Sequence, residues 1–479
     1  MREKHFVILG AGPAGLGAAF KLVKSRPFRV TVLEQNHYVG GNAGSFDLGG
    51  LRVDYGSHRL HPACAPEIFE DIHTLLGDDL LDHPRHGRIR LRKHWIHFPL
   101  KPFDLAFKLP FSFSAGVGFD IAGRLLPNGK ALSEVETFAT VMQKGLGKTI
   151  CRDYYFPYAS KIWGIEPENL SVALARQRVP DNSLPKMVMK ILSTLPGLKS
   201  KGSERFFYPR CGYGQISEAY NCAAQEAGAQ VLLGAKVTSI EMNHKDGREG
   251  KHTVYFERDG KRERIQADYV WSTIPITVLA HILSPSPSLS LQEAARKIEY
   301  RAMILVYLVL EQDHFTEYDA HYFPEADIPI SRLSEPKNYS NNIDPKGRTV
   351  LCAELPCEPD GAEWNSSNAD LGRLVVDALN AAGLPVQVPI DQVLVRKLKH
   401  AYPIYHQGYE LFFDQLDDWT NGIDGLLTFG RQGLFAHDNT HHALFMAYSA
   451  VDCINENGSF DKQRWQDYRR IFETHVIED

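Results

Sequence analysis

The sequence has few cysteines and no long apolar segment. Its 479 residues include seven cysteines, none of them in a CxxC pair, which predicts a reducing, cytoplasmic setting and no cysteine-based metal site. The stretch 269–292 contains no Lys, Arg, Asp or Glu. Prolines interrupt it well short of the roughly 20 apolar residues that a membrane span needs. We therefore expect no transmembrane segment.

The sequence also lacks an excess of either charge. The formal net charge is −5 and the isoelectric point about 6.5, a balance that predicts neither a nucleic acid nor an anionic membrane as partner. The hydrophobic content of 43% is ordinary for a globular protein. A chain of this length exceeds one compact core, so we expect at least two domains. The oligomeric state does not follow from the sequence.

Glycine is present where a dinucleotide would need it. An apolar run at residues 5–9 leads into Gly10, Gly12 and Gly15 and an alanine-rich helix that reaches Leu22. In this pattern Gly10 makes the turn, Gly12 lets the backbone approach a pyrophosphate, and Gly15 lets the helix pack on the strand. The pyrophosphate would lie at the helix N-terminus, beside Pro13 and Ala14.

A second strand supports this interpretation. The β-branched run 29–33 ends at Glu34, 19 residues after Gly15 and followed by Gln35. An acid at this distance accepts hydrogen bonds from the ribose hydroxyls. Order and spacing together predict a dinucleotide site.

The next segment indicates which dinucleotide. Residues 39–44, Val-Gly-Gly-Asn-Ala-Gly, resemble the second glycine-rich loop of the FAD-dependent amine oxidase superfamily. Most members have an arginine after the glycine pair, whereas Asn42 stands here, as in UDP-galactopyranose mutases. The resemblance implies FAD as cofactor, with Gly41, Asn42 and Ala43 among its contacts.

A histidine-bearing segment follows a hairpin that we predict at 46–54 with its turn at Gly49-Gly50. Residues 55–62, Tyr-Gly-Ser-His-Arg-Leu-His-Pro, resemble the loop that lies against the flavin in UDP-galactopyranose mutases. The resemblance implies that His58, Arg59 and His61 are catalytic. Histidine titrates near neutral pH and suits proton transfer. The alternative is a loop with two surface histidines.

Candidate substrate contacts come later in the chain. The run 154–171 resembles the aromatic, lysine, tryptophan-glycine segment of the same mutases and, more loosely, a helix of protoporphyrinogen oxidases, which implies a substrate role for Trp163. These aromatic residues are equally typical of a helical core. Arg176 and Arg178 follow, and the resemblance implies that one of them contacts an anionic substrate without deciding which. The alternative is a solvated helix face.

Further segments complete the resemblance. In the predicted strand 231–240, the backbone of Val237 would pair with the adenine, and Tyr402 and Tyr405 would line the substrate side of the flavin. A strand then ends in Gly-Arg, and a helix beginning at about His441 would direct its N-terminus at the flavin ring. Cofactor contacts implied here are Gly430, Arg431, His437, Asp438 and Asn439. The histidines lack metal-ligand spacing, so we expect no metal.

These expectations combine into one fold class: α/β, with a Rossmann-like FAD-binding domain of the GR2-type flavoproteins and inserted helical and α+β substrate domains. The FAD-binding domain is expected at 1–90, 205–285 and 425–479. A mostly helical insertion is expected at 91–204 and a substrate-binding domain at 286–424. Within them we expect a helix at 66–81, helical spacing through Val135 and Phe138, and a polar stretch without periodicity at 318–339.

Two functions fit the resemblance. The first is an FAD-dependent oxidoreductase that moves a hydride between a small-molecule substrate, such as a sugar or sugar nucleotide, and flavin N5. The alternative is a redox-neutral sugar nucleotide mutase that uses reduced flavin as a nucleophile. Net redox chemistry is favoured, because the segments at 430–435 and 318–339 depart from the mutase pattern. A flavoprotein acting as a binding or redox scaffold is a third reading.

Overall fold

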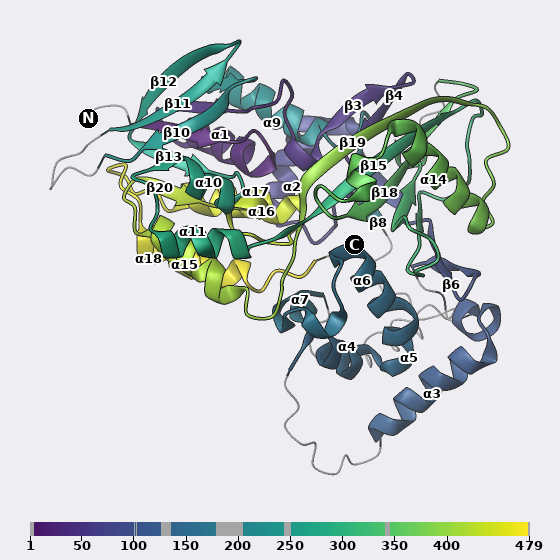
Figure 1. The fold of residues 1–479 in the computed structure, drawn as a ribbon. Helices are drawn as coiled ribbons and strands as arrows, with labels where there is room; N and C mark the ends of the chain where they lie inside the picture. Colours follow the sequence, from purple (N-terminus) through teal and green to yellow (C-terminus); the bar gives the residue numbers. More distant parts are fainter. Residues whose placement is uncertain are drawn as a thin grey trace.

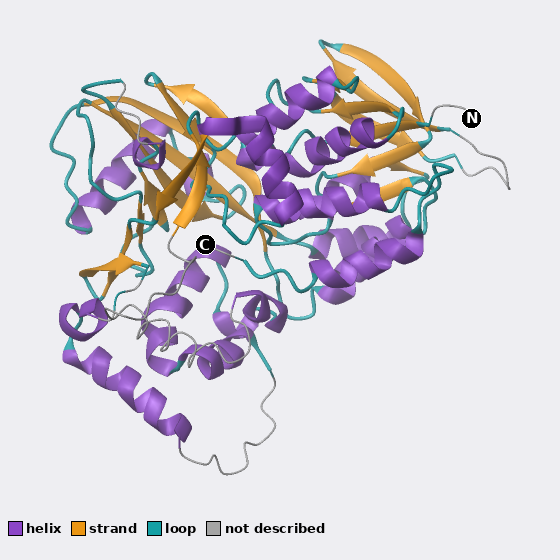
Figure 2. Ribbon diagram, turned by 180° about the vertical axis from the view of Figure 1, so that it is seen from behind, coloured by secondary structure: helices purple, strands orange, loops and turns teal. Residues whose placement is uncertain are grey.

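The computed structural model describes residues 4–99, 101, 103–125, 136–178, 205–243, 251–340 and 345–477. Two groups of strands lie side by side, and a helical lobe extends away from them (Figures 1 and 2). Among the described residues, no helix combines the length and apolar character that crossing a bilayer requires.

A parallel sheet forms the nucleotide-binding half. Its order is β20 (Leu426–Thr428), β13 (Tyr269–Ser272), β1 (His5–Leu9), β2 (Arg29–Leu33) and β9 (Gln230–Leu232), and every neighbouring pair is parallel. Phe6 and Ile8 pack in the core shared with the helices, whereas Val7 and Leu9 belong to the core on the opposite face. This alternation is the two-residue period of a strand that is buried on both faces.

Helices cover one face of this sheet and an antiparallel sheet covers the other. The helices are α1 (Pro13–Ser25), α2 (Pro66–Leu76), α9 (Gln215–Glu226), α17 (Thr440–Asp452) and α18 (Lys462–Phe472). The second sheet consists of β10 (Lys236–Glu241), β11 (His252–Arg258), β12 (Lys261–Ala267) and β14 (Leu283–Ser284), and α10 (Ile276–Ile282) directly precedes β14 in the chain. The parallel pairing of β1 with β2 places the carboxyl ends of these two strands beside each other.

A mixed seven-stranded sheet forms the other half. Its order is β19 (Ile390–Pro403), β15 (Tyr300–Leu310), β18 (Thr349–Cys357), β17 (Arg332–Ser334), β16 (Ala320–Tyr322), β6 (Gly87–Leu91) and β7 (His94–Phe98). Helix α14 (Asn368–Ala381) packs on one face, and the hairpin β3 (Ser45–Leu48) and β4 (Leu51–Asp54) packs on the other. Because both faces are covered, all residues of β15 are buried.

The helical lobe lies below both sheets in Figure 1. It contains α3 (Phe111–Leu125), α4 (Phe138–Leu146), α5 (Lys148–Ile150), α6 (Phe156–Trp163) and α7 (Val172–Arg178). Its core joins that of α11 (Leu289–Lys297) and α15 (Glu410–Asn421). Shorter elements are β5 (Leu80–Pro84) paired with β8 (Arg205–Pro209), α12 (Lys337–Ser340), α13 (Ala362–Asn365) and α16 (Gly430–Gly433).

Several sequence expectations need correction. The helix expected at 66–81 ends at Leu76, because Gly77 adopts a positive φ and β5 begins three residues later. The strand expected at 231–240 is two strands of different sheets, separated by a turn at Gly234 with a φ of +67°. The stretch 318–339 is not irregular, since β16, β17 and the start of α12 lie within it.

Helices α15 and α18 were not expected from the sequence. Val135 and residues 179–204 lie outside the described residues. The expected domain boundary at residue 90 falls inside β6, which pairs with β16 of the seven-stranded sheet.

Candidate functional site

The glycine turn between β1 and α1 has the backbone that the sequence predicts. Gly10 has a φ of +98°, and its N–H donates to the carbonyl of Leu33 at 2.8 Å. A Cβ on Gly15 would lie 2.0 Å from the oxygen of Gly10, so only glycine allows α1 to approach the turn this closely. A Cβ on Gly12 would meet nothing within 4 Å. The start of α1 is therefore open on the side where an anion would bind.

Glu34 stands at the end of β2, next to this turn. One carboxylate oxygen accepts from the backbone N–H of Ala11 at 2.8 Å, and the other accepts from the N–H and the side chain of Asn36 at 2.9 and 2.7 Å. The carboxylate is buried but lies on the wall of a cavity. Three donors thus fix it in the position from which it can accept from a ribose hydroxyl.

One cavity of about 490 Å³ connects most of the predicted residues. Its lining includes the glycine turn, Glu34, Gln35 and the loop 40–43, together with Arg332, residues 397–400 and Tyr402. Predicted residues that line it are Gly10, Gly12, Pro13, Ala14, Glu34, Gln35, Gly41, Asn42, Ala43, His58, Arg59, His61, Tyr402, Arg431, His437, Asp438 and Asn439. Asn42 also donates to the carbonyl of His400 at 3.2 Å, which ties the second glycine loop to β19.

The histidine loop forms the middle of the cavity wall. His58 donates from Nε2 to the carbonyl of Tyr55 at 2.9 Å and stacks on Tyr213 with ring centroids 5.3 Å apart. Burial lowers the pKa of His58, so the ring is neutral. The bond to Tyr55 uses Nε2 and leaves Nδ1 out. A neutral imidazole held this way can accept or relay a proton.

Arg59 has a different environment from its neighbour. Its guanidinium donates to the hydroxyls of Tyr322 and Tyr339 at 3.0 and 3.3 Å and to Asp319 at 3.3 Å. These partners belong to the seven-stranded sheet and the loops beside it. The side chain therefore anchors the histidine loop to the second half of the molecule, a role that the sequence did not indicate.

Cationic and aromatic side chains gather around His437, which lies on the cavity wall. The ring of His437 meets Trp163 and Tyr402 edge to face, with centroids 5.9 and 5.0 Å apart. The guanidinium of Arg178 lies 5.2 Å from the Trp163 ring, and that of Arg431 lies 5.3 Å from the Tyr402 ring. Burial lowers the pKa of His437 well below its usual value, and the charges of Arg178 and Arg431 lower it further.

The structure separates the two arginines of α7. Arg176 is paired with Glu136 at 2.9 Å, and 65% of its side chain is exposed. Arg178 instead lies over Trp163 and acts electrostatically on His437. Of this pair, Arg178 is the one directed toward the site.

Seven predicted residues do not line the cavity. Three are Trp163, Arg176 and Arg178, described above, and the other four are Tyr405, Gly15, Gly430 and Val237. Tyr405 is buried behind its wall, where its hydroxyl donates to the carbonyl of Phe435 at 2.8 Å and accepts from the N–H of His437 at 3.1 Å. Gly15 packs on the turn, and a Cβ on Gly430 would lie 2.7 Å from that of Ala14. Val237 lies in β10, opposite Phe256. These residues support the site rather than border its cavity.

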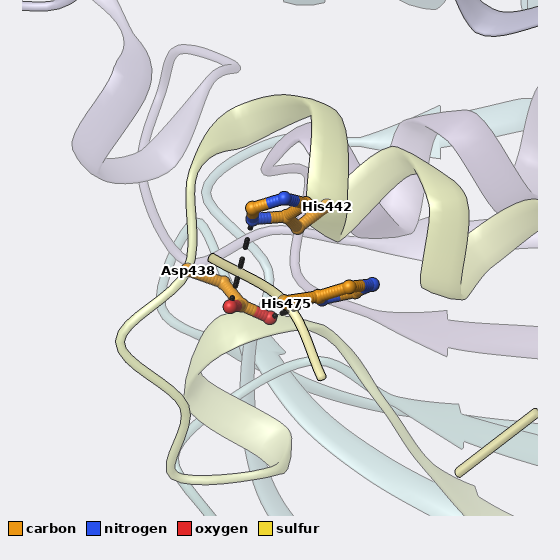
Figure 3. A group of neighbouring side chains, drawn as sticks. All are labelled: Asp438, His442 and His475. Carbon is orange, nitrogen blue, oxygen red and sulfur yellow. Dashed lines mark hydrogen bonds and ion pairs between the residues drawn. The ribbon is translucent and has the colours of Figure 1, made fainter. Parts of the chain in front are cut away.

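A carboxylate and two imidazoles lie together at the start of α17 (Figure 3). Asp438 accepts from Nδ1 of His475 at 3.1 Å and lies 3.6 Å from Nδ1 of His442. Burial and the nearby histidines lower the pKa of His442 to about 2. The two rings are stacked, with centroids 4.1 Å apart and planes 12° apart.

These three side chains meet the proximity expected of a metal site, but their orientation does not suit one. An imidazole binds a metal in its ring plane at about 2.0–2.1 Å. Two stacked rings have parallel planes, so a single ion could not lie in both. The group is instead a hydrogen-bonded link that holds the C-terminal residues against α17, and Ile477 reaches the cavity wall.

The lining fits FAD by its unsatisfied donors. Several buried polar atoms of the described residues have no hydrogen-bond partner within the protein, and Nε of Arg59, Nε of Arg431 and Nδ1 of His437 are among them. All three belong to residues on the cavity wall. Buried polar groups are normally satisfied, so these atoms point to a bound molecule with several acceptors. A pyrophosphate and a flavin ring are such acceptors, and the open helix N-terminus and Glu34 fit the rest of FAD.

Sequence reasoning missed some residues of the wall. Arg332, paired with Glu354 at 2.9 Å, lies in a strand of the stretch expected to be irregular. The alternation of polar Arg332 with apolar Leu333 was the sequence signal that could have predicted a strand there. Ile477 gave no signal, because only the packing of the C-terminal residues brings it to the cavity.

Comparisons with known proteins agree with this geometry. The family described as flavin containing amine oxidoreductase matches residues 13–435. The 1-hydroxycarotenoid 3,4-desaturase of Flavobacterium sp. (strain P99-3) is 26% identical over 266 residues, 51% of this chain and 52% of that protein. The chain thus spans about half of that relative, and less of the two phytoene-converting enzymes of Streptomyces griseus and Fusarium fujikuroi. Coproporphyrinogen III oxidase of Bacillus subtilis (strain 168) is 20% identical over 85% of this chain and 89% of that protein.

Solved structures show the same fold. Reduced UDP-galactopyranose mutase superposes with a TM-score of 0.80 at 19% identity, covering 100% of this chain and 99% of that one. Cyclohexylamine oxidase from Brevibacterium oxydans IH-35A gives 0.65 at 16% identity, covering 98% and 100%. At such identities the likeness concerns the fold and carries no activity with it.

Proposed function

The chain belongs to the flavin-containing amine oxidoreductase family and its cofactor is FAD, and from this premise we propose an oxidoreductase that moves a hydride between a small anionic substrate and FAD. The observation that carries the proposal is a group of cationic and aromatic side chains at the cavity wall. Tyr402, Arg431 and His437 line the cavity, Trp163 contacts the ring of His437, and Arg178 lies over Trp163.

In this proposal, each part of the cavity holds one part of the cofactor. The N-terminus of α1 and Gly12 bind the pyrophosphate, and Glu34 accepts from the ribose. Arg431, His437 and the N-terminus of α17 surround the ring. When bound, FAD supplies a hydride acceptor or donor at N5.

The protein's own side chains would orient the substrate and handle its proton. Arg178 and Arg332 attract the anionic group, and Trp163 and Tyr402 flank the reacting part. His58 is neutral and lies on the cavity wall, so it can take up the proton that leaves a hydroxyl or amine as the hydride departs. Burial keeps His437 neutral as well, which limits it to hydrogen bonding.

A spectroscopic titration tests the proposal. The purified protein should be yellow and release FAD, and anaerobic addition of its substrate should bleach the flavin absorption in a one-to-one ratio. Sugars, sugar nucleotides, amines and carboxylates form the first panel. A yellow protein that no member of the panel bleaches, yet that converts one of them without change of redox state, would contradict net hydride transfer.

A second candidate is a redox-neutral mutase acting on a sugar nucleotide, which requires reduced flavin as nucleophile. The observation that favours it is the group of Arg178, Arg332 and Arg431, which together could bind a diphosphate. Dithionite-reduced enzyme should then interconvert the ring forms of a sugar nucleotide without consuming reductant, and oxidised enzyme should be inert. If both forms are inert toward sugar nucleotides, this candidate is excluded.

A further inference from the structure

Large apolar side chains are exposed together on one edge of the helical lobe. Phe103, Phe107, Phe111 and Phe119 are 65%, 74%, 85% and 77% exposed. The remaining exposed large apolar side chains of the described residues are Tyr38, Val278, Leu289, Leu411 and Ile471, which belong to separate elements. Four exposed phenylalanines within 17 residues form a cluster, whereas exposed apolar side chains that occur singly are ordinary on protein surfaces. Figure 1 places α3 at the opposite end of the molecule from the parallel sheet.

The exposed residues of α3 whose side chains the structure describes carry no charge. The exposed residues of this helix, whose side chains the structure describes, are Phe111, Ser112, Gly118, Phe119, Ala122 and Gly123. On a helix of 3.6 residues per turn these positions fall on one side. A solvated helix face normally contains charged residues, so this face is built for an apolar environment.

The opposite face of α3 is fixed to the protein. Phe113 is buried, and Asp120, the one acid of the helix, accepts from the backbone N–H of Thr149 at 2.7 Å. A Cβ on Gly116 would lie 2.7 Å from the hydroxyl of Thr149, so the helix lies close against α5. The phenylalanines therefore point outward because the helix is held, and not because it is unpacked.

A short helix before α3 extends the cluster. Phe103 and Phe107, on adjacent turns of residues 103–108, have ring centroids 4.7 Å apart. Asp104 points inward, where it is 2% exposed and binds the N–H of His97 at 2.6 Å and Lys108 at 3.0 Å. This segment, like α3, directs its acid inward and its aromatic rings outward.

The exposed charges around the cluster are positive. Residues 92–125 contain five basic residues and two acids, and both acids, Asp104 and Asp120, are turned into the protein. Lys93 and Lys101 are exposed, and Lys108 is 39% exposed. The local charge thus differs from the slightly negative charge of the whole chain.

We propose that this face, made of Phe103, Phe107, Phe111 and Phe119 with Lys93 and Lys101, docks on the surface of an anionic lipid bilayer. Phenylalanine side chains would enter the boundary between headgroups and acyl chains, and the lysines would meet lipid phosphates. A second copy of the chain is the less suitable occupant, because pairing this face with itself would bring lysines against lysines. The bilayer complements both the apolar rings and the charge.

Vesicle sedimentation tests the docking surface on the full-length holoprotein. Vesicles of equal parts phosphatidylglycerol and phosphatidylcholine should pull down the protein, whereas vesicles of phosphatidylcholine alone should bind it far less. Phe111→Ser together with Phe119→Ser should weaken partitioning by about tenfold for each side chain. Lys101→Glu should weaken it by about fivefold or more, and raised salt should weaken the binding of the natural protein.

A matched control removes apolar side chains elsewhere. Leu289 and Leu411 are 83% and 70% exposed, and replacing both by serine should leave vesicle binding unchanged. Flavin content and melting temperature verify that each variant is folded. Phe119→Trp adds a reporter whose fluorescence should shift to the blue with anionic vesicles.

Three outcomes would overturn the proposal. One is a holoprotein that sediments with no vesicle, and another is a phenylalanine double variant that binds as well as the natural protein. The third is light scattering that shows a dimer which the same double variant dissociates, because the face would then join two copies of the chain.

Discussion

The proposed site has a nucleotide end and a substrate end, which are built in different ways. The nucleotide end comes from residues 10–43, which are continuous in sequence, and it acts through backbone groups and one carboxylate. The substrate end takes Trp163 from α6, Arg178 from α7 and Tyr402 from β19, together with Arg431 and His437 from the segment after β20. One end therefore depends on local backbone geometry, and the other on the packing of separate elements.

The strongest test of this difference is at Gly15. A Cβ there would lie 2.0 Å from the Gly10 oxygen, and backbone cannot yield as a side chain can. We expect Gly15→Ala to lower the free energy of unfolding by more than about 4 kcal/mol, to the point that little folded protein is recovered. Urea unfolding, or soluble yield where unfolding cannot be followed, provides the measurement. A variant as stable as the natural protein would refute the close-approach argument.

Gly12→Val should separate binding from folding. A Cβ at this position meets no protein atom within 4 Å, and the valine side chain would enter the space of the pyrophosphate. We expect a folded, colourless protein that FAD does not reconstitute, as judged by circular dichroism and flavin absorption. A yellow variant would show that the cofactor does not pass this glycine.

Arg178→Ala tests the substrate end, and Arg176→Ala is its matched control on the same helix. Losing a charge-assisted contact to an anionic substrate should weaken binding by roughly 2 to 4 kcal/mol, with FAD content unchanged. The control removes an exposed ion pair and should change binding by less than about 1 kcal/mol. Both are measured as KM or Kd for the substrate found by flavin bleaching. Equal effects of the two changes on substrate binding would count against a substrate contact by Arg178.

His58→Ala examines the wall between the two ends. Because His58 is the neutral imidazole on that wall, we expect turnover to fall by on the order of 100-fold while FAD stays bound. His73→Ala, at an exposed histidine of α2, is the control and should leave turnover unchanged. Unchanged turnover in the His58 variant would return this histidine to a packing role.

The smallest expected effect is a dependence on pH. Burial and neighbouring histidines lower the pKa of His441 to about 4. A lowered pKa means that the unfolded chain takes up a proton first, so stability is complete above about pH 6.5 and falls as the pH drops toward 4. His441 alone should cost roughly 2 kcal/mol at pH 5.

Unfolding by urea at pH 7 and pH 5 measures this loss, and His441→Gln should reduce it. If the variant and the natural protein lose equal stability between pH 7 and pH 5, the acid sensitivity arises from groups other than His441.

The sequence predicted far more of the nucleotide end than of the substrate end. The turn at Gly10, the strand ending at Glu34 and the start of α17 near His441 are confirmed by the structure. Local spacing sufficed there, because each feature is fixed by residues a few positions apart. The choice between Arg176 and Arg178 could not be predicted, because it depends on how α7 is turned relative to Trp163 and Glu136.

Mean composition does not describe every segment of the chain. A net charge of −5 gives no indication of an anionic membrane partner, whereas the docking surface that we propose lies in residues 92–125, which expose phenylalanine and lysine and turn both acids inward. A whole-chain average cannot register which side chains of a short segment are directed outward.

By itself, the sequence determined the α/β class, FAD as the cofactor and the glycine turn beside Glu34, because glycine spacing and strand ends follow from local backbone geometry. Tertiary structure alone decided which arginine packs on Trp163, that Arg59 anchors the histidine loop, and that Asp438 joins His475 from the far end of the chain. Those contacts join residues far apart in sequence, and only the packing of complete elements sets such distances.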